Sequence, residues 1–298
     1  MFFGERLKVH FSTTDEANDD DEPFALDGLQ NYSATHALLQ HALSNQALAD
    51  SANAEPLSLV QAAQRLREQG AMPPGGFGTL ALETVTADVQ QVVVAWQAAC
   101  AHWTRPADIR EVRHEAHGIT IEDWLGDLRH DELDGYVRLL PMASRLRKNG
   151  TLRYDKLLAA WAVHLLANAN GLALTTHVFA TDTVLALPAI DRTTAVARLD
   201  DVLAALRDGM QKPLPIARKT AFAWLLADAD EKKNAYTLAS RCYDGSEGDW
   251  GAVGEVAEDA CLARTWSDFA QLHAAGFEDW LHLYRPLLEA VSMTEGDA

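Results

Sequence analysis

The apolar residues change their spacing between residues 109 and 141, and this change restricts the possible folds more than any other feature. Two turn-forming dipeptides, His117-Gly118 and Asp134-Gly135, separate short alternating or apolar runs in this segment. The runs contain Ile119, Ile121, Trp124, Leu128, Val137 and Leu139. Alternation with a period of two is typical of β-strands, so the segment is predicted to be a β-meander.

The chain before this segment carries three apolar patterns with helical spacing. One is centred on Leu38 and Leu39, a second begins after Ser58 and stops at Gly70, and a third ends near His102. Serine is a common first residue of a helix, and glycine commonly ends one. Three helices are therefore predicted before the meander.

Helical spacing returns after the meander, and two further strands are expected near residues 177–179 and 184–187. Leu157, Trp161 and Leu165 share one stripe of the helix expected between the meander and these strands, and they are predicted to be buried against the sheet. Most of the remaining chain is predicted to be helical. Helices, a small sheet, a crossover helix and further strands together predict an α/β layered domain.

Net charge limits the ways in which this chain can bind nucleic acid. Lys and Arg total 25 and Asp and Glu total 43, which gives a formal net charge of −18 over 298 residues. This balance excludes a broadly basic surface, because such a body repels polyanions. Any contact with nucleic acid therefore requires a local cluster of cations.

The cysteines and the apolar runs indicate the compartment. Cys100, Cys242 and Cys261 lie far apart without a CxxC pair, which excludes a zinc ribbon and a redox dithiol. Their odd number argues against a secreted disulfide framework. No apolar run approaches the ~20 residues that span a bilayer. We therefore expect a cytoplasmic protein without membrane contact.

Two groups of basic residues interrupt the acidic sequence. The stronger group brackets Asn149-Gly150, between the meander and the next helix, and consists of Arg145, Arg147, Lys148, Arg153 and Lys156. The weaker group surrounds two prolines and consists of Lys212, Arg218 and Lys219. Each group is either a solvated turn or a contact for phosphate groups.

Motifs for catalysis are mostly missing from the sequence. There is no GxxxxGK[ST] loop for phosphate and no GxSxG elbow for a nucleophilic serine. His114 and His117 are three residues apart, which would suit a metal site on a helix, although the alternation around them favours the end of a hairpin. Nucleophilic catalysis is therefore unsupported, and no cofactor is expected.

Six segments, in order along nearly the whole chain, carry a resemblance to a known family. They are Phe2 to Val9; Glu22 to Tyr32; Pro73 to Gly78; Ile119 to Leu125; Trp161 with His164-Leu165 and Gly171; and Arg207 to Leu214. In this order and spacing they resemble the C-terminal domain of RecC, the gamma subunit of exodeoxyribonuclease V. None of the segments is a catalytic motif by itself.

The resemblance implies a fold and a domain organisation. The implied fold is a PD-(D/E)XK restriction-endonuclease-like domain, with a small mixed sheet flanked by helices and with extra helices. We expect residues 1–298 to form this single domain. The helicase-like N-terminal domains of the family are then absent from the sequence, which would make it a C-terminal fragment or a truncated product.

The resemblance also locates the positions at which active nucleases of this fold hold magnesium. A metal-binding Asp corresponds to Gly126, the Asp and Lys of a D-x-K triplet correspond to Arg138 and Leu140, and a His on an earlier helix corresponds to Leu82. None of these four residues can perform the nuclease chemistry, and a cation at position 138 would repel magnesium. We therefore expect no catalytic residue and no metal ligand.

The function implied by the resemblance is non-catalytic DNA handling and subunit docking. The complex would be the ATP-dependent helicase and nuclease that resects broken duplex ends for recombination, with its beta and alpha subunits and a duplex DNA end as partners. The candidate DNA contacts are Arg145, Arg147, Lys148 and Arg153.

Two alternatives remain open at this point. The first is a metal-dependent nuclease with a displaced site formed by Glu83, Asp123 and Asp127. The second is a protein-interaction module without DNA contact. Whether cations converge on one face of the folded chain would separate the second alternative from DNA handling.

Overall fold

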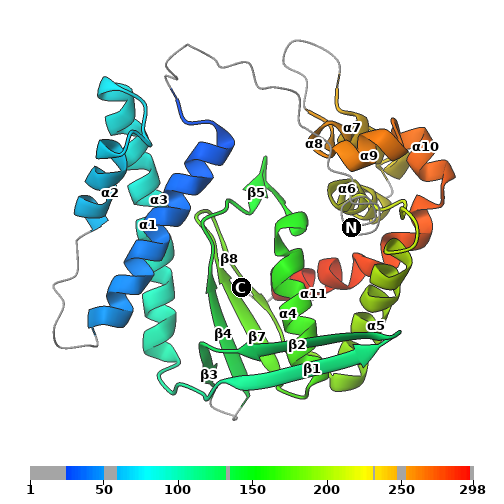
Figure 1. Cartoon of the computed structure of the whole chain (residues 1–298), viewed down its shortest axis with the longest axis horizontal. Helices are drawn as coiled ribbons and strands as arrows, with labels where there is room; N and C mark the ends of the chain where they lie inside the picture. Colours follow the sequence, from blue (N-terminus) through cyan, green and yellow to red (C-terminus); the bar gives the residue numbers. More distant parts are fainter. Residues whose placement is uncertain (1–24, 50–58, 132–134, 231, 247–252, 296–298) are drawn as a thin grey trace.

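The computed structural model of the protein has a mixed four-stranded sheet at its centre (Figure 1). The structure describes residues 25–49, 59–131, 135–230, 232–246 and 253–295. The strand order is β3-β4-β7-β8, and only β4 and β7 are parallel to each other. The strands are β3 (Leu128–His130), β4 (Tyr136–Pro141), β7 (Leu174–Phe179) and β8 (Val184–Leu187).

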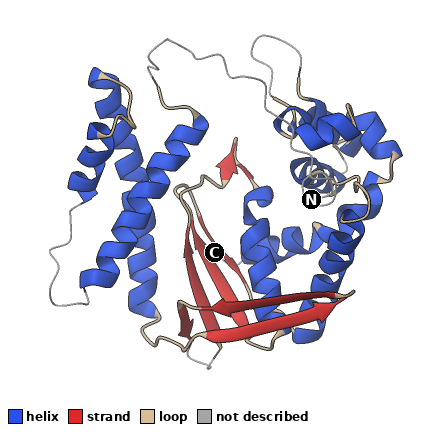
Figure 2. Ribbon diagram, viewed as in Figure 1, coloured by secondary structure: helices blue, strands red, loops and turns tan. Residues whose placement is uncertain are grey.

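Helices cover both faces of this sheet (Figure 2). One face packs on α3 (Gly75–His102), which in turn packs on α1 (Gly28–Ala49) and α2 (Leu59–Glu68). The other face carries α4 (Leu158–Ala169), with α5 (Arg192–Gly209) and α11 (Arg285–Glu295) beside it. The three helices predicted before the meander and the layered α/β class are thereby confirmed.

Alternation along the strands separates the side chains into two cores, because successive strand residues point to opposite faces. Val137, Leu139 and Phe179 pack with the buried valines of α3. Leu174 and Val178 pack instead with α4. Arg138 and Leu140 therefore point to the α4 face of β4, where Arg138 lies in register between Leu128 and Thr176.

The predicted burial of the α4 stripe is confirmed. Leu157 is fully buried, and Trp161 and Leu165 are 4% and 1% exposed. The Trp161 ring stacks on the ring of His164, with 5.4 Å between the ring centroids. The guanidinium of Arg198, from α5, lies 6.0 Å from the centre of the Trp161 ring. The Trp161 ring thus links α4 to α5.

The prediction of one continuous β-meander is wrong. The hairpin of β1 (Arg110–Ala116) and β2 (Ile119–Leu125) forms a separate two-stranded sheet that contacts α4 and α5. Asp127 has a φ of 55°, a left-handed conformation that turns the chain between β2 and β3, and these two strands do not pair with each other. Val112 and Leu125 are buried in the α4 core, which holds the hairpin across the end of the main sheet.

A group of short helices follows α5 and completes the α4 face. The elements are α6 (Arg218–Asp228), α7 (Ala235–Asp244), α8 (Glu255–Glu258), α9 (Ala260–Thr265), α10 (Phe269–Ala274) and η3 (Phe277–Leu283). Phe269 and Phe277 are buried edge to face between these helices, with 5.6 Å between ring centroids. The prediction of a mostly helical C-terminal part is confirmed. Within the described residues, the structure has no helix long and apolar enough to cross a membrane.

Candidate nucleic-acid interface

The stronger basic group lies on a small hairpin that projects from the main sheet (Figure 1). The hairpin consists of β5 (Arg147–Lys148) and β6 (Thr151–Leu152), with Asn149 and Gly150 in left-handed conformations at its turn. The carboxylate of Asp182 accepts hydrogen bonds of 2.8 Å from the backbone N–H groups of Leu146 and Arg147. The base of the hairpin is therefore fixed to the turn between β7 and β8.

The four predicted DNA contacts have different environments. Arg147 and Lys148 are exposed on β5, and the Arg147 guanidinium donates a 3.3 Å hydrogen bond to the carbonyl of Gly150. Arg145 is exposed but forms a 3.3 Å ion pair with Asp88 on α3. Arg153 is half-buried at the start of η2 (Tyr154–Leu157). The hairpin tip therefore presents Arg147 and Lys148 to solvent.

The two basic groups of the sequence partly converge in space, which sequence reasoning did not predict. Tyr154 of η2 stacks on Phe222 of α6, with 5.3 Å between ring centroids. This contact brings Lys156 near Arg218 and Lys219 at the start of α6. Burial lowers the pKa of Lys156, and the positive charges of Arg153, Arg218 and Lys219 lower it further, while Asp155 opposes them.

The four positions of the expected nuclease site lie on α3, at the β2–β3 junction and on β4. Leu82 is half-buried on α3, and Gly126 lies between β2 and β3. Arg138 and Leu140 lie on β4, on the face that packs against α4. Glu83, from the displaced-site alternative, is exposed on α3, while Asp123 lies on β2. Among the described residues, no three His, Cys, Asp or Glu side chains are grouped so as to hold a metal ion.

Arg138 is the electrostatically unusual residue of this region. Its Nη1 atom is buried and has no hydrogen-bond partner within the described part of the chain. Burial lowers the pKa of the guanidinium, and the negative charges of Asp127 and Asp123 raise it. An arginine remains charged in proteins, so Arg138 places a cation beside these two carboxylates.

The histidine pair of the sequence lies at the end of the β1–β2 hairpin, as its alternation predicted. His114 is on β1, and its Nε2 lies 2.6 Å from a carboxylate oxygen of Asp200 on α5. His117 is in the turn, with a φ of 55°. His114 therefore attaches the hairpin to α5, and His117 forms part of its turn.

The sequence matches a known protein family over most of its length. The description "RecC C-terminal domain" belongs to a family model that matches residues 1–229. The chain belongs to this family. The match includes the main sheet and α1 to α6, and it ends before α7. The resemblance carried by the six sequence segments is thereby confirmed, although residues 1–24 of the first two segments lie outside the described residues.

A curated relative extends this comparison. The protein named "RecBCD enzyme subunit RecC" from Escherichia coli strain K12 is 28% identical to the chain over 235 residues. The aligned region covers 78% of this chain but 19% of that relative. The RecC C-terminal domain described here therefore corresponds to about a fifth of the length of the relative.

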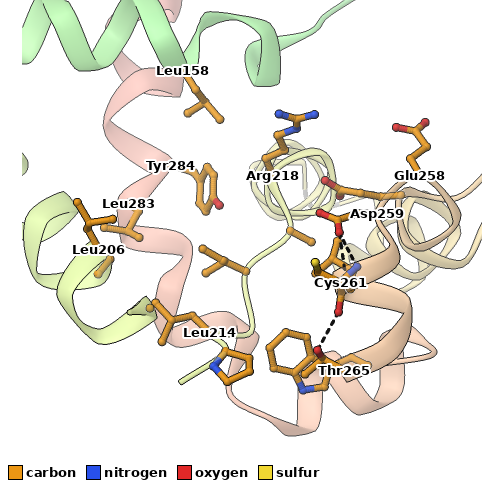
Figure 3. A pocket seen from close by; sticks show the side chains of 18 of the residues that line it. Leu158, Leu206, Leu214, Arg218, Glu258, Asp259, Cys261, Thr265, Leu283 and Tyr284 are labelled. Carbon is orange, nitrogen blue, oxygen red and sulfur yellow. Dashed lines mark hydrogen bonds between the residues drawn. The ribbon is translucent and has the colours of Figure 1, made fainter. Parts of the chain in front are cut away.

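A pocket lies where the part matched by the RecC C-terminal family meets the C-terminal helices (Figure 3). It has a volume of about 600 Å³. Its walls come from the start of α4, α5, the segment 213–217, α6, α8, α9 and the end of η3. Leucine, isoleucine, valine, alanine and proline side chains form most of the lining, with Trp266 and Tyr284 among them. Nothing in the sequence pattern joined these distant segments.

Proposed function

We propose that this chain is a non-catalytic DNA-handling and subunit-docking domain of a RecBCD-type helicase and nuclease. The complex would act in recombinational repair of broken DNA, as the resemblance to exodeoxyribonuclease V implies, and the RecC relative is named as a subunit of the RecBCD enzyme. The beta and alpha subunits of that enzyme and a duplex DNA end are the proposed partners. We also propose that the main sheet has the PD-(D/E)XK arrangement.

The observation that carries the non-catalytic part of the proposal is the position of Arg138. Nucleases of the proposed fold require two carboxylates around magnesium and a lysine near the attacking water. In the correspondence that the resemblance implies, Arg138 takes the place of one carboxylate, and its positive charge interacts with Asp127 and Asp123. A guanidinium there competes with magnesium for the same two carboxylates, so the displaced-site alternative is disfavoured on electrostatic grounds.

A metal titration tests this part of the proposal. We expect calorimetric titration of the full chain with Mg²⁺ or Mn²⁺ to be flat at millimolar concentrations, because Arg138 repels a cation and Gly126 supplies no ligand. A saturable site that Asp127→Asn abolishes would contradict the proposal and favour the nuclease. Metal-dependent cutting of linear DNA that the same substitution abolishes would contradict it equally.

The DNA-handling part of the proposal rests on the β5–β6 hairpin. The net charge of −18 gives the isolated chain no long-range attraction to DNA. We infer that other subunits deliver the duplex and that Arg147 and Lys148 then position its phosphate backbone. The anchoring of the hairpin base by Asp182 supports this role, because a fixed tip positions a ligand better than a mobile one.

Charge reversal at the hairpin tip is the corresponding experiment. We expect Arg147→Glu with Lys148→Glu to slow unwinding by the reconstituted complex severalfold at low salt, because two phosphate contacts are lost. The difference from the wild type should shrink at raised salt, which weakens those contacts and screens the repulsion of the new carboxylates. Assembly of the complex should not change. Arg65→Glu with Arg67→Glu is the matched control, since both residues are exposed on α2, and this control should unwind normally. Equal unwinding by both double variants would favour the module without DNA contact.

A further inference from the structure

The pocket between α5, α6 and α9 is built to receive an apolar group. Its volume of about 600 Å³ is in the range of binding pockets for small molecules and for anchoring side chains. Leu158, Leu206, Leu214 and Leu283 face it from four separate segments (Figure 3). An open apolar surface of this kind normally marks a site of interaction.

Three of the four charged residues that line the pocket are already engaged within the described part of the chain. Glu255 accepts hydrogen bonds at the start of α6 from the backbone N–H groups of Lys219 and Thr220. Glu258 pairs with the ammonium of Lys219. Asp259 accepts hydrogen bonds from two backbone N–H groups at the start of α9. These carboxylates stabilise the walls of the pocket and need no ligand.

Arg218 is the exception. It is exposed at the edge of the pocket, and its guanidinium has no hydrogen bond or ion pair among the described residues (Figure 3). The packing of η2 on α6 adds the cation of Lys156 to its surroundings. Arg218 is therefore a cation at the edge of the pocket that can pair with an anion, although the chain as a whole is strongly acidic.

We propose that this pocket binds a short segment of another subunit of the complex, with apolar side chains in the pocket and a carboxylate on Arg218. The proposal rests on the subunit-docking function proposed above and gives it a location. Apolar anchors next to a complementary charge are the usual pattern when a peptide or helix binds in a groove.

The lining favours a polypeptide over a nucleic acid strand. Bases in single-stranded sites stack on exposed aromatic rings. Aliphatic side chains dominate this pocket, whereas Tyr284 is buried and Trp266 is half-buried. The carboxylates of Glu258 and Asp259 lie beside Arg218 on the lining. They disfavour a phosphate backbone, which carries a charge at every nucleotide, more strongly than a single carboxylate that pairs with Arg218.

Photocross-linking in the reconstituted complex tests the proposal. The photoreactive residue p-benzoylphenylalanine replaces Leu206, whose side chain faces the pocket. We expect an adduct with a segment of another subunit that has an Asp or Glu within about one helical turn of the cross-linked residue. The substitution Arg218→Glu should lower the adduct yield about tenfold, because it replaces attraction by repulsion.

Two controls make the outcomes decisive. Arg241→Glu makes the same change of charge on the neighbouring helix α7, away from the pocket lining, and should leave the yield unchanged. Arg218→Glu should fold, because an acidic residue is favourable in the first turn of a helix, and its thermal unfolding checks this. An adduct with DNA, with a segment that lacks acidic residues, or with no polypeptide would overturn the proposal.

Assembly and unwinding, measured on the same sample, separate this proposal from the function on which it rests. If the complex assembles and unwinds DNA but gives no polypeptide adduct at position 206, only the pocket proposal fails. If the chain does not assemble with the other subunits, the docking function fails with it.

Discussion

Replacing Trp161 with alanine is expected to lower the free energy of unfolding by about 3–5 kcal/mol. Trp161 is 4% exposed and belongs to the core that joins α4 to the main sheet and to α5. Its removal would leave a cavity, and the ring of His164 and the guanidinium of Arg198 would lose their aromatic neighbour. Such a cavity costs the lost burial and the lost contacts together.

Urea unfolding of the full chain measures this effect, and Trp124 provides a matched control. Trp124 lies on β2 and is 66% exposed, so Trp124→Ala should change the free energy of unfolding by less than about 0.5 kcal/mol. Trp161→Phe keeps part of the ring and should fall between the two alanine variants. A Trp161→Ala variant as stable as Trp124→Ala would contradict the arrangement of α4 on the sheet.

The same helix shows why much of the fold could be predicted from the sequence. Leu157, Trp161 and Leu165 recur at helical spacing, and that spacing alone determines that they share a face. The period of two in β1, β2 and β4 likewise identified strands. Local periodicity therefore predicted the type and approximate position of these elements.

Pairing between strands could not be predicted in the same way. The left-handed φ of Asp127 at the β2–β3 junction helps to decide whether β2 continues the main sheet. Aspartate adopts this conformation only occasionally, so its presence in the sequence gives no signal. The separate β1–β2 hairpin is stabilised by contacts with α4 and α5, which are distant in the sequence.

The candidate sites were harder still to predict from the sequence, because contacts between distant segments form them. The basic group at 145–156 was visible as a local run, but its neighbours Arg218 and Lys219 are brought close by the stacking of Tyr154 on Phe222. The pocket has lining residues from Leu158 to Tyr284. No local pattern could have identified it, because each segment contributes only one or a few apolar residues.

Acidification is expected to destabilise the protein through His164, a residue whose environment also depends on distant contacts. The side chain is fully buried between α4 and β7. Its Nδ1 lies 3.1 Å from the hydroxyl of Thr176, and its Nε2 lies 3.1 Å from the carbonyl oxygen of Pro188. Burial lowers the pKa of His164 from 6.5 to about 4, the hydrogen bond to Pro188 opposes this, and the positive charge of Arg138 lowers it further.

The direction of the pH effect follows from this lowered pKa. In the unfolded chain His164 gains a proton below about pH 6.5, whereas in the folded protein it stays neutral until about pH 4. The unfolded state therefore binds more protons in this range, and the folded state loses stability as the pH falls. The loss due to His164 is expected to be about 2 kcal/mol between pH 7 and pH 5.

Unfolding by urea at several pH values, compared between variants, isolates this contribution. Gln at position 164 cannot titrate. Between pH 7 and pH 5 the free energy of unfolding of His164→Gln should therefore fall by about 2 kcal/mol less than that of the wild type. His177, whose pKa burial also lowers, contributes equally to both proteins and cancels in the difference. His117→Gln, at the exposed hairpin turn, should keep the pH dependence of the wild type. Parallel curves for His164→Gln and the wild type would contradict this prediction, because they would mean that His164 has the same pKa in the folded and the unfolded state.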